Sequence, residues 1–107
     1  MVIEGIPMNI NQLKYVLAVA GASSMREAAA KLYVSQPALS ASIRELEEEL
    51  GLLLFERTNK GISLTEEGRD FVSYAKNTVS QYEILEDRYL SRDSDKEYFS
   101  VSTLLRK

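Results

Sequence analysis

The sequence predicts a mainly α-helical fold, in which three helices and a two-stranded hairpin precede one long helix. Side chains typical of helix N-caps occur at four places, Asn9, Ser24, Ser35 and Thr65. Apolar residues recur three and four positions apart after each of them. Between the third and fourth of these segments, a turn-forming sequence separates two short extended stretches. Helical periodicity therefore dominates the chain, and one hairpin interrupts it.

The first two helices are each marked by a capping signal. Asn9 and Gln12 have the spacing of a capping box, in which two side chains and two backbone N–H groups bond reciprocally. Gly21 is suited to end this first helix. Ser24 and Glu27 repeat the capping-box spacing, and the small apolar residues that follow predict a second helix of roughly two or three turns.

The third helix has the clearest period in the chain. Ser35 can cap it, and Pro37 falls in its first turn, where a missing N–H costs little. Gly51 is suited to end it. Its apolar residues recur at intervals of four, three and four, at Leu39, Ile43, Leu46 and Leu50. At about 100° per residue these side chains share one side of the helix, which we expect to face the core.

A second face of this helix predicts contact with DNA. Two helices joined by a tight turn at Tyr33 and Val34 form a helix-turn-helix when the second presents polar groups. Gln can pair with adenine, Ser with several groups and Arg with guanine or phosphate, while an alanine methyl suits the thymine methyl. These residue types form a face separate from the leucines, at Gln36, Pro37, Ser40, Ala41 and Arg44. An ordinary solvated helix face is the alternative interpretation.

After the third helix the pattern changes from helical to extended. Leu52–Arg57 is predicted to be extended, Thr58–Gly61 to form a turn and Ile62–Leu64 to return as a short strand. The resulting hairpin, a wing over residues 54–64, makes the predicted fold a winged helix-turn-helix. Its cations could instead be edge charges that discourage strand pairing.

Thr65 is expected to cap a final helix that reaches Leu90 or Ser91. At about 1.5 Å per residue this helix spans roughly 40 Å, more than a small domain needs. Its broad apolar stripe requires a cover, and a second copy of the chain is the simplest one. Packing within one chain is the alternative. The stripe predicted to form a homodimer interface consists of Phe71, Val72, Ala75, Val79, Tyr82, Leu85 and Tyr89.

Composition narrows the range of functions. The 107 residues include neither Cys nor His, which excludes disulfides and the commonest catalytic and metal-binding side chains. No secretory signal or membrane-spanning run is recognised, so a cytoplasmic protein with no membrane contact, no cofactor and no enzymatic activity is expected. The net charge of -3 opposes nucleic-acid binding. That objection is weak, because a local basic surface can coexist with an acidic remainder.

Several linked motifs resemble those of the LysR-type transcriptional regulators. The match covers about Met8 to Leu90, and its segments follow the order and spacing of the family signature. They are Leu32–Ser40, Ile43–Glu47, Leu50–Gly51, Leu54–Arg57 and Leu64–Gly68. The resemblance implies a DNA-binding domain that pairs through the helix after Thr65, as a dimer and often a tetramer.

The resemblance also assigns three groups of residues to DNA. The first lies at the start of the second helix beside a phosphate, the second on the third helix at the major groove, and the third on the wing. Many family members have Arg and Gln where this sequence has Ala41 and Ser42, so a different preferred operator is expected. The predicted DNA-binding residues are Ser24, Arg26, Ser35, Gln36, Pro37, Ser40, Ala41, Arg44, Arg57, Thr58 and Lys60.

The expected domain organisation has four parts. Residues 1–7 form an N-terminal extension, 8–64 the DNA-binding domain, 65–91 the linker and dimerisation helix, and 92–107 a hinge. The last part includes a strand-like stretch, interpreted as the start of a ligand-sensing domain that the chain lacks. A small-molecule co-inducer is expected to act only through that missing domain.

Two functions are compatible with these patterns. The first is sequence-specific binding of double-stranded DNA at an imperfect inverted repeat, which regulates transcription. The alternative is a helical protein–protein interaction module that keeps the helix-turn-helix only as a scaffold. A glutamate cluster at the end of the third helix could suggest a metal site, but a solvated helix end is the preferred interpretation. This cluster consists of Glu45, Glu47, Glu48 and Glu49.

Overall fold

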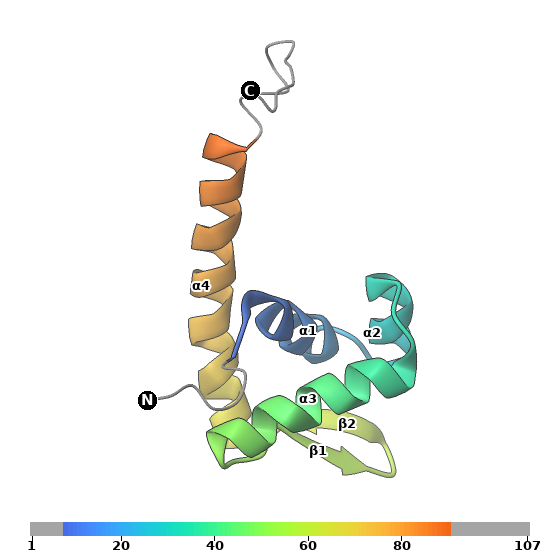
Figure 1. Cartoon of the computed structure of the whole chain (residues 1–107). Coiled ribbons are helices and arrows are strands. Elements are labelled where there is room, and N and C mark those ends of the chain that lie inside the picture. Colours follow the sequence, from blue (N-terminus) through green and yellow to red (C-terminus); the bar gives the residue numbers. More distant parts are fainter. Residues whose placement is uncertain (1–7, 91–107) are drawn as a thin grey trace. The chain divides into compact units, whose positions relative to one another are not determined.

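The computed structural model describes residues 8–90, so the predictions for residues 1–7 and 92–107 lie outside it. Four helices and one hairpin follow one another as predicted (Figure 1). The elements are α1 (Ile10–Ala20), α2 (Met25–Leu32), α3 (Gln36–Leu50), β1 (Phe55–Thr58), β2 (Gly61–Leu64) and α4 (Glu66–Tyr89). The chain divides into two compact units after Lys76, and each is described separately.

The first unit is built around the contacts among its three short helices. Helix α1 packs on both α2 and α3, and α2 packs on the N-terminal part of α3 (Figure 1). The periodic apolar residues point into this core, as predicted, with Leu39 and Leu46 of α3 fully buried beside Val16 and Val19 of α1. Burial of such side chains is the main stabilising contribution to a domain of this size.

The predicted capping residues occupy the helix starts. The Asn9 side chain accepts from the Gln12 N–H, and the Gln12 side chain accepts from the Asn9 N–H, both at 3.0 Å. The Ser24 hydroxyl accepts from the Glu27 N–H at 3.0 Å, but the Glu27 carboxylate bonds to Ser23 instead of closing a box with Ser24. Each cap satisfies N–H groups that have no partner inside the helix.

The turn between α2 and α3 contains an unusual backbone conformation at Tyr33. Its φ of 61° places this residue in the left-handed region, where a side chain is crowded. The conformation ends α2, because the Tyr33 N–H reaches the Ala30 carbonyl and the Val34 N–H reaches the Ala29 carbonyl. The Tyr33 side chain is 94% exposed.

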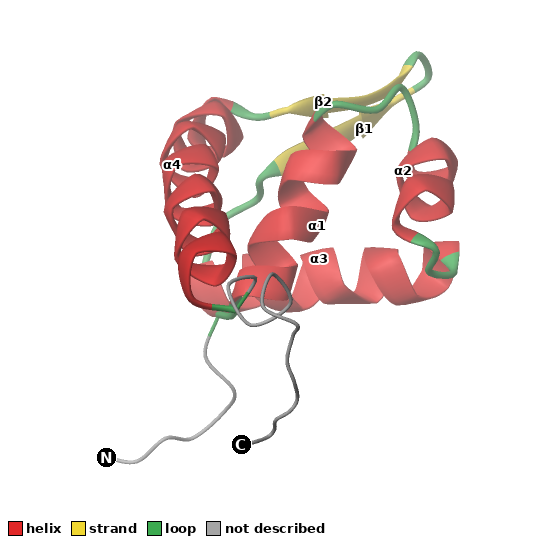
Figure 2. Cartoon of the chain, turned by 90° about the horizontal axis from the view of Figure 1, so that it is seen from above, coloured by secondary structure: helices red, strands yellow, loops and turns green. Residues whose placement is uncertain are grey.

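The hairpin ladder covers residues 55–64 and so matches the predicted wing over residues 54–64 to within one residue. Strand β1 begins at Phe55 instead of Leu52, and it pairs antiparallel with β2 from Phe55–Leu64 to Thr58–Gly61. Leu52 and Leu53 are exposed and lie outside the ladder, whereas Leu54 is fully buried directly before β1. In Figures 1 and 2 the turn of the hairpin lies on the side of α2.

The junction between the hairpin and α4 is held by Thr65. Its hydroxyl accepts from the Gly68 N–H at 2.8 Å, which caps α4, and donates to the Leu53 carbonyl at 2.7 Å. Its backbone N–H donates to the Leu54 carbonyl at 3.0 Å. The approach of this carbonyl to α4 is so close that a side chain at Gly68 would overlap with it. The segment before β1 is therefore fixed against the first turn of α4.

The predicted stripe of α4 differs in exposure along its length. In the first unit, Val72 and Ala75 are less than one-tenth exposed, and Val72 belongs to the core. In the second unit, the exposed apolar side chains include Tyr82, Leu85 and Tyr89. No helix within residues 8–90 has the length and apolar character needed to cross a bilayer.

Candidate nucleic-acid interface

The polar face of α3 is accessible, as its sequence pattern predicts. The residues that anchor α3, Leu39, Ile43 and Leu46, are all buried. On the polar face of α3, Ser40 is half-buried. Four other predicted DNA-binding side chains are exposed there, those of Gln36, Pro37, Ala41 and Arg44. Because the buried residues fix the helix against the core, the polar face is presented on a rigid element.

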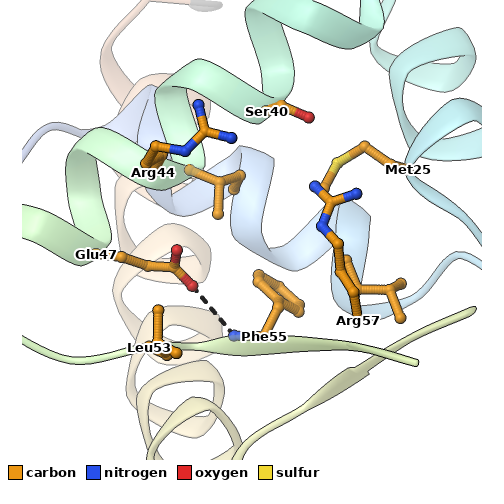
Figure 3. A pocket seen from close by; sticks show the side chains of 9 residues that line it. Met25, Ser40, Arg44, Glu47, Leu53, Phe55 and Arg57 are labelled. Atoms are coloured by element: carbon orange, nitrogen blue, oxygen red, sulfur yellow. Dashed lines mark hydrogen bonds between the residues drawn. The ribbon is translucent and has the colours of Figure 1, made fainter.

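A cleft of about 240 Å³ separates α3 from β1 (Figure 3). Ser40 and Arg44 line it from α3, and Arg57 lines it from β1. Glu47 of α3 also lines this cleft, and the other lining residues are apolar, among them Met25 and Phe55. Two arginines, one from α3 and one from β1, therefore border the same cleft.

A second cleft lies between the start of α2 and the hairpin. It is lined by Ser24 and Arg26 of α2, by Gln36 at the start of α3 and by Arg57 and Thr58 of β1. Arg57 thus borders both clefts. The N-terminus of α2 adds N–H groups and the positive end of its dipole, which favour an anion.

Four predicted DNA-binding cations have no acidic partner. Within residues 8–90, the side chains of Arg26, Arg44, Arg57 and Lys60 form neither a hydrogen bond nor an ion pair. By contrast, Lys31 at the far end of α2 is paired with Glu27 at 4.0 Å. The unpaired cations are thus available to a polyanion without first breaking a contact inside the protein.

Other predicted residues lie outside the two clefts. The Ser35 hydroxyl accepts from the Ala38 N–H at 3.2 Å, so its acceptor role is to cap α3. Pro37 and Ala41 are on the exposed surface of α3, and Lys60 is at the tip of the hairpin. Asn59 shares that tip but was not among the predicted DNA-binding residues, although the sequence places it in the turn.

The expectation of a solvated helix end is wrong for Glu47. Its side chain is half-buried, and its Oε2 accepts from the Leu54 N–H at 2.8 Å and from the Phe55 N–H at 3.2 Å. Figure 3 shows the second of these bonds. No local sequence signal predicts this contact, because the partners lie seven and eight residues away across a turn.

The other three glutamates of the cluster remain exposed near the C-terminal end of α3. Together with Asn9 and Gln12 of α1 they line a shallow acidic hollow, formed by Glu45, Glu48 and Glu49. The Met8 N–H donates to the Glu49 carboxylate at 3.1 Å. In the described part of the chain, no three acidic side chains are grouped as metal ligands would be.

Glu27 has a perturbed acidity at the start of α2. Hydrogen bonds from the Ser23 N–H and hydroxyl, followed by the charge of Lys31, lower the pKa of its carboxyl below the ordinary value of 4.5. Each of these groups favours the ionised form. The Glu27 side chain is exposed, and its hydrogen bonds are to the local turn at Ser23.

Three packed helices, a two-stranded wing and an exposed polar third helix define the class of winged helix-turn-helix domains. Within that class the chain belongs to the LysR family. Its residues 10–69 match the family model described as bacterial regulatory helix-turn-helix protein, lysR family. The resemblance inferred from the sequence motifs is thereby confirmed.

Curated relatives match the same region. The DNA-binding transcriptional dual regulator OxyR of Escherichia coli strain K12 is 40% identical over 80 residues, which cover 75% of this chain and 26% of that protein. The regulator ClcR of Pseudomonas putida is 40% identical over 77 residues, 72% of this chain and 26% of ClcR. The chain spans about a quarter of the length of the curated relatives it matches.

Solved structures agree with this assignment. The CbnR DNA-binding domain in complex with DNA has a TM-score of 0.72 and 39% identity, covering 83% of this chain and 100% of that one. The BenM domain in complex with the benA site 1 DNA has a TM-score of 0.72 and 38% identity, covering 76% of this chain and 94% of that one. The winged helix-turn-helix fold predicted from the sequence is confirmed.

Proposed function

We propose that this chain binds double-stranded DNA sequence-specifically and regulates transcription, with no enzymatic activity of its own. Helix α3 enters the major groove, and the wing lies on the backbone and toward the minor groove. The observation that carries the proposal is a set of four cations around α3 and the wing that form no ion pair with any acidic group among residues 8–90. Phosphate contacts by such cations supply most of the sequence-independent affinity for DNA.

The individual side chains have complementary roles in this proposal. Gln36, Ser40 and Ala41 contact base edges, and Arg44 contacts a base or a phosphate beside them. Arg26 and the capped start of α2 contact a second phosphate, with Ser24 and Ser35 nearby. Relatives whose names or structures include DNA support the same assignment.

The active form is proposed to be a homodimer that pairs through α4. Tyr82, Leu85 and Tyr89 are the exposed members of the predicted stripe. Two copies would place two α3 helices on the half-sites of an inverted repeat, with centres separated by a multiple of roughly 10.5 bp. The proposed organisation is residues 8–64 for DNA binding and 65–91 for pairing, in the cytoplasm. Higher assembly and response to a co-inducer would require the ligand-sensing domain.

A gel-shift series in increasing salt tests this function. Each phosphate that the protein neutralises contributes about 0.9 to the slope of log affinity against log salt. Arg44→Ala and Lys60→Ala are each expected to weaken binding, and Lys60→Ala to flatten the slope by about that amount. Lys76→Ala removes an equal charge from α4 and serves as the matched control, with an unchanged slope expected.

The interaction-module alternative predicts a different result from the same experiment. The acidic hollow at the end of α3 and the net charge of -3 favour it. Under this alternative, the wild-type chain would not prefer a duplex selected from a random pool over a scrambled duplex of equal length. Specific binding of the selected duplex at physiological salt would contradict the interaction-module alternative.

A further inference from the structure

We infer that Glu47 is a positioning residue that holds the wing at a fixed angle to the recognition helix, so that both engage DNA together. The inference rests on the proposed DNA-binding function and assigns a role to a side chain outside the predicted contact residues. It starts from the two hydrogen bonds from Leu54 and Phe55, at 2.8 and 3.2 Å, to one carboxylate oxygen of α3.

The wing needs such a support because it is small. It has two strands of four residues, and an isolated two-stranded hairpin is at best marginally stable in water. One face of the wing packs on the core through Phe55, which is buried, and through Ile62 and Leu64, which are half-buried, whereas every residue from Thr58 to Gly61 is exposed. Any tilt at the base is carried to Lys60 at the tip.

Glu47 acts at that base from the recognition helix. It lies on α3 one turn beyond Arg44, and the N–H groups it accepts from are at the start of β1. On the other side of the same segment, Thr65 holds the carbonyl groups of Leu53 and Leu54. The segment is thus bonded through its N–H groups to α3 and through its carbonyl groups to the start of α4.

Glu47 bonds to the start of the wing without forming an ion pair with the neighbouring arginines. The carboxylate lines the same cleft as Arg44 and Arg57, but it bonds to backbone N–H groups and forms no ion pair with either arginine (Figure 3). Bonds from N–H groups to an ionised carboxylate are about twice as strong as neutral ones. The wing is therefore anchored while both guanidinium groups stay available for phosphate.

A double-mutant cycle on the 107-residue chain tests the inference. The probe is a duplex selected from a random pool by the wild-type chain, and the readout is the slope of log affinity against log salt. In the wild type, Lys60→Ala is expected to reduce the slope by about 0.9. In a Glu47→Ala background, Lys60→Ala is expected to change the slope by much less, because the displaced wing no longer reaches its phosphate.

Three further variants separate positioning from charge and from folding. Glu48→Ala removes the same charge from the adjacent, exposed residue and should leave the Lys60 effect at its wild-type size. Glu47→Gln keeps an acceptor oxygen at the same length and should restore most of the effect. If Glu47→Ala does not fold by circular dichroism, Glu47→Asp, whose carboxylate is one methylene shorter, is expected to diminish the Lys60 effect in the same way.

The outcomes are distinguishable. An undiminished Lys60 effect in the Glu47→Ala or Glu47→Asp background overturns the inference, as does an equal reduction in Glu48→Ala. A Lys60→Ala variant with the wild-type slope also overturns it, because the wing then has no phosphate contact to position. A wild-type chain that binds no duplex specifically instead contradicts the proposed function.

Discussion

Gly68 shows how a single residue constrains the junction between the wing and α4. The Leu54 carbonyl passes so close to this position that only a residue without a side chain fits. The same carbonyl accepts the Thr65 N–H, so it cannot move away without breaking that bond. Glycine is required here because there is no space for a side chain. The backbone of Gly68 is helical, so a left-handed conformation is not the reason.

Gly68→Ala is therefore expected to destabilise the fold. Forcing a methyl group into a packed site costs about 1 to 3 kcal/mol, which denaturant unfolding followed by circular dichroism would measure. Gly21→Ala is the matched control, because a side chain there meets only an ordinary contact with the Leu17 carbonyl. An equal loss of stability in both variants would contradict the steric explanation.

Glu27 gives a prediction about pH. Its pKa is lower in the folded chain than its ordinary value of 4.5, so its contribution to stability is complete above that value. The contribution is lost as the pH falls through the lower, folded-state pKa. The stability difference between the wild type and Glu27→Gln should shrink over this range, and NMR titration of the Glu27 carboxyl should show a higher pKa in Ser23→Ala.

At the scale of the elements, most helix starts could be predicted because their signals are local. The caps at Asn9, Ser35 and Thr65 each bond to an N–H three residues ahead, so that the whole interaction is contained in four consecutive residues. The buried face of α3 could be predicted for the same reason, since Leu39, Ile43 and Leu46 differ from its polar residues by helical period alone.

The remaining features depend on contacts between segments far apart in the sequence. The start of β1 at Phe55 depends on the hydrogen bonds to Glu47 and Thr65 that engage residues 53 and 54 outside the ladder. The left-handed Tyr33 could not be predicted either, because glycine and asparagine are the residues usually found in that conformation. The local pattern of polar and apolar residues predicts neither the contacts between distant segments nor the left-handed backbone at Tyr33.

The fold should lose stability when an apolar side chain on the buried face of α3 is truncated. Leu46 is fully buried, so Leu46→Ala is expected to cost about 2 to 5 kcal/mol in the free energy of unfolding. Leu53 is 61% exposed, so Leu53→Ala removes the same atoms with an expected effect within about 0.5 kcal/mol. Similar costs for the two substitutions, measured by urea unfolding, would contradict the packing described for α3.

At the scale of the whole molecule, the proposed homodimer depends on the exposed apolar side chains of α4. Leu85→Glu places a carboxylate within the proposed interface, where it would be buried without a partner, and should raise the dimer dissociation constant by about tenfold or more. Ser80→Glu adds the same charge on another side of α4 and should leave the dimer dissociation constant unchanged. Sedimentation equilibrium measures both, and equal effects would count against pairing along Leu85.

The separation of charge along α3 has a consequence for how the molecule approaches the proposed DNA partner. Glu45, Glu48 and Glu49 gather at its C-terminal end, whereas Arg26 and Arg57 share a cleft with its first turn. In the field of a polyanion this asymmetry produces a torque, which turns the acidic end away before the surfaces touch. Collisions in the wrong orientation are thereby repelled, and productive encounters become more frequent at low ionic strength. The placement of the charges along α3, and not the net charge, thus selects the orientation in which the molecule approaches.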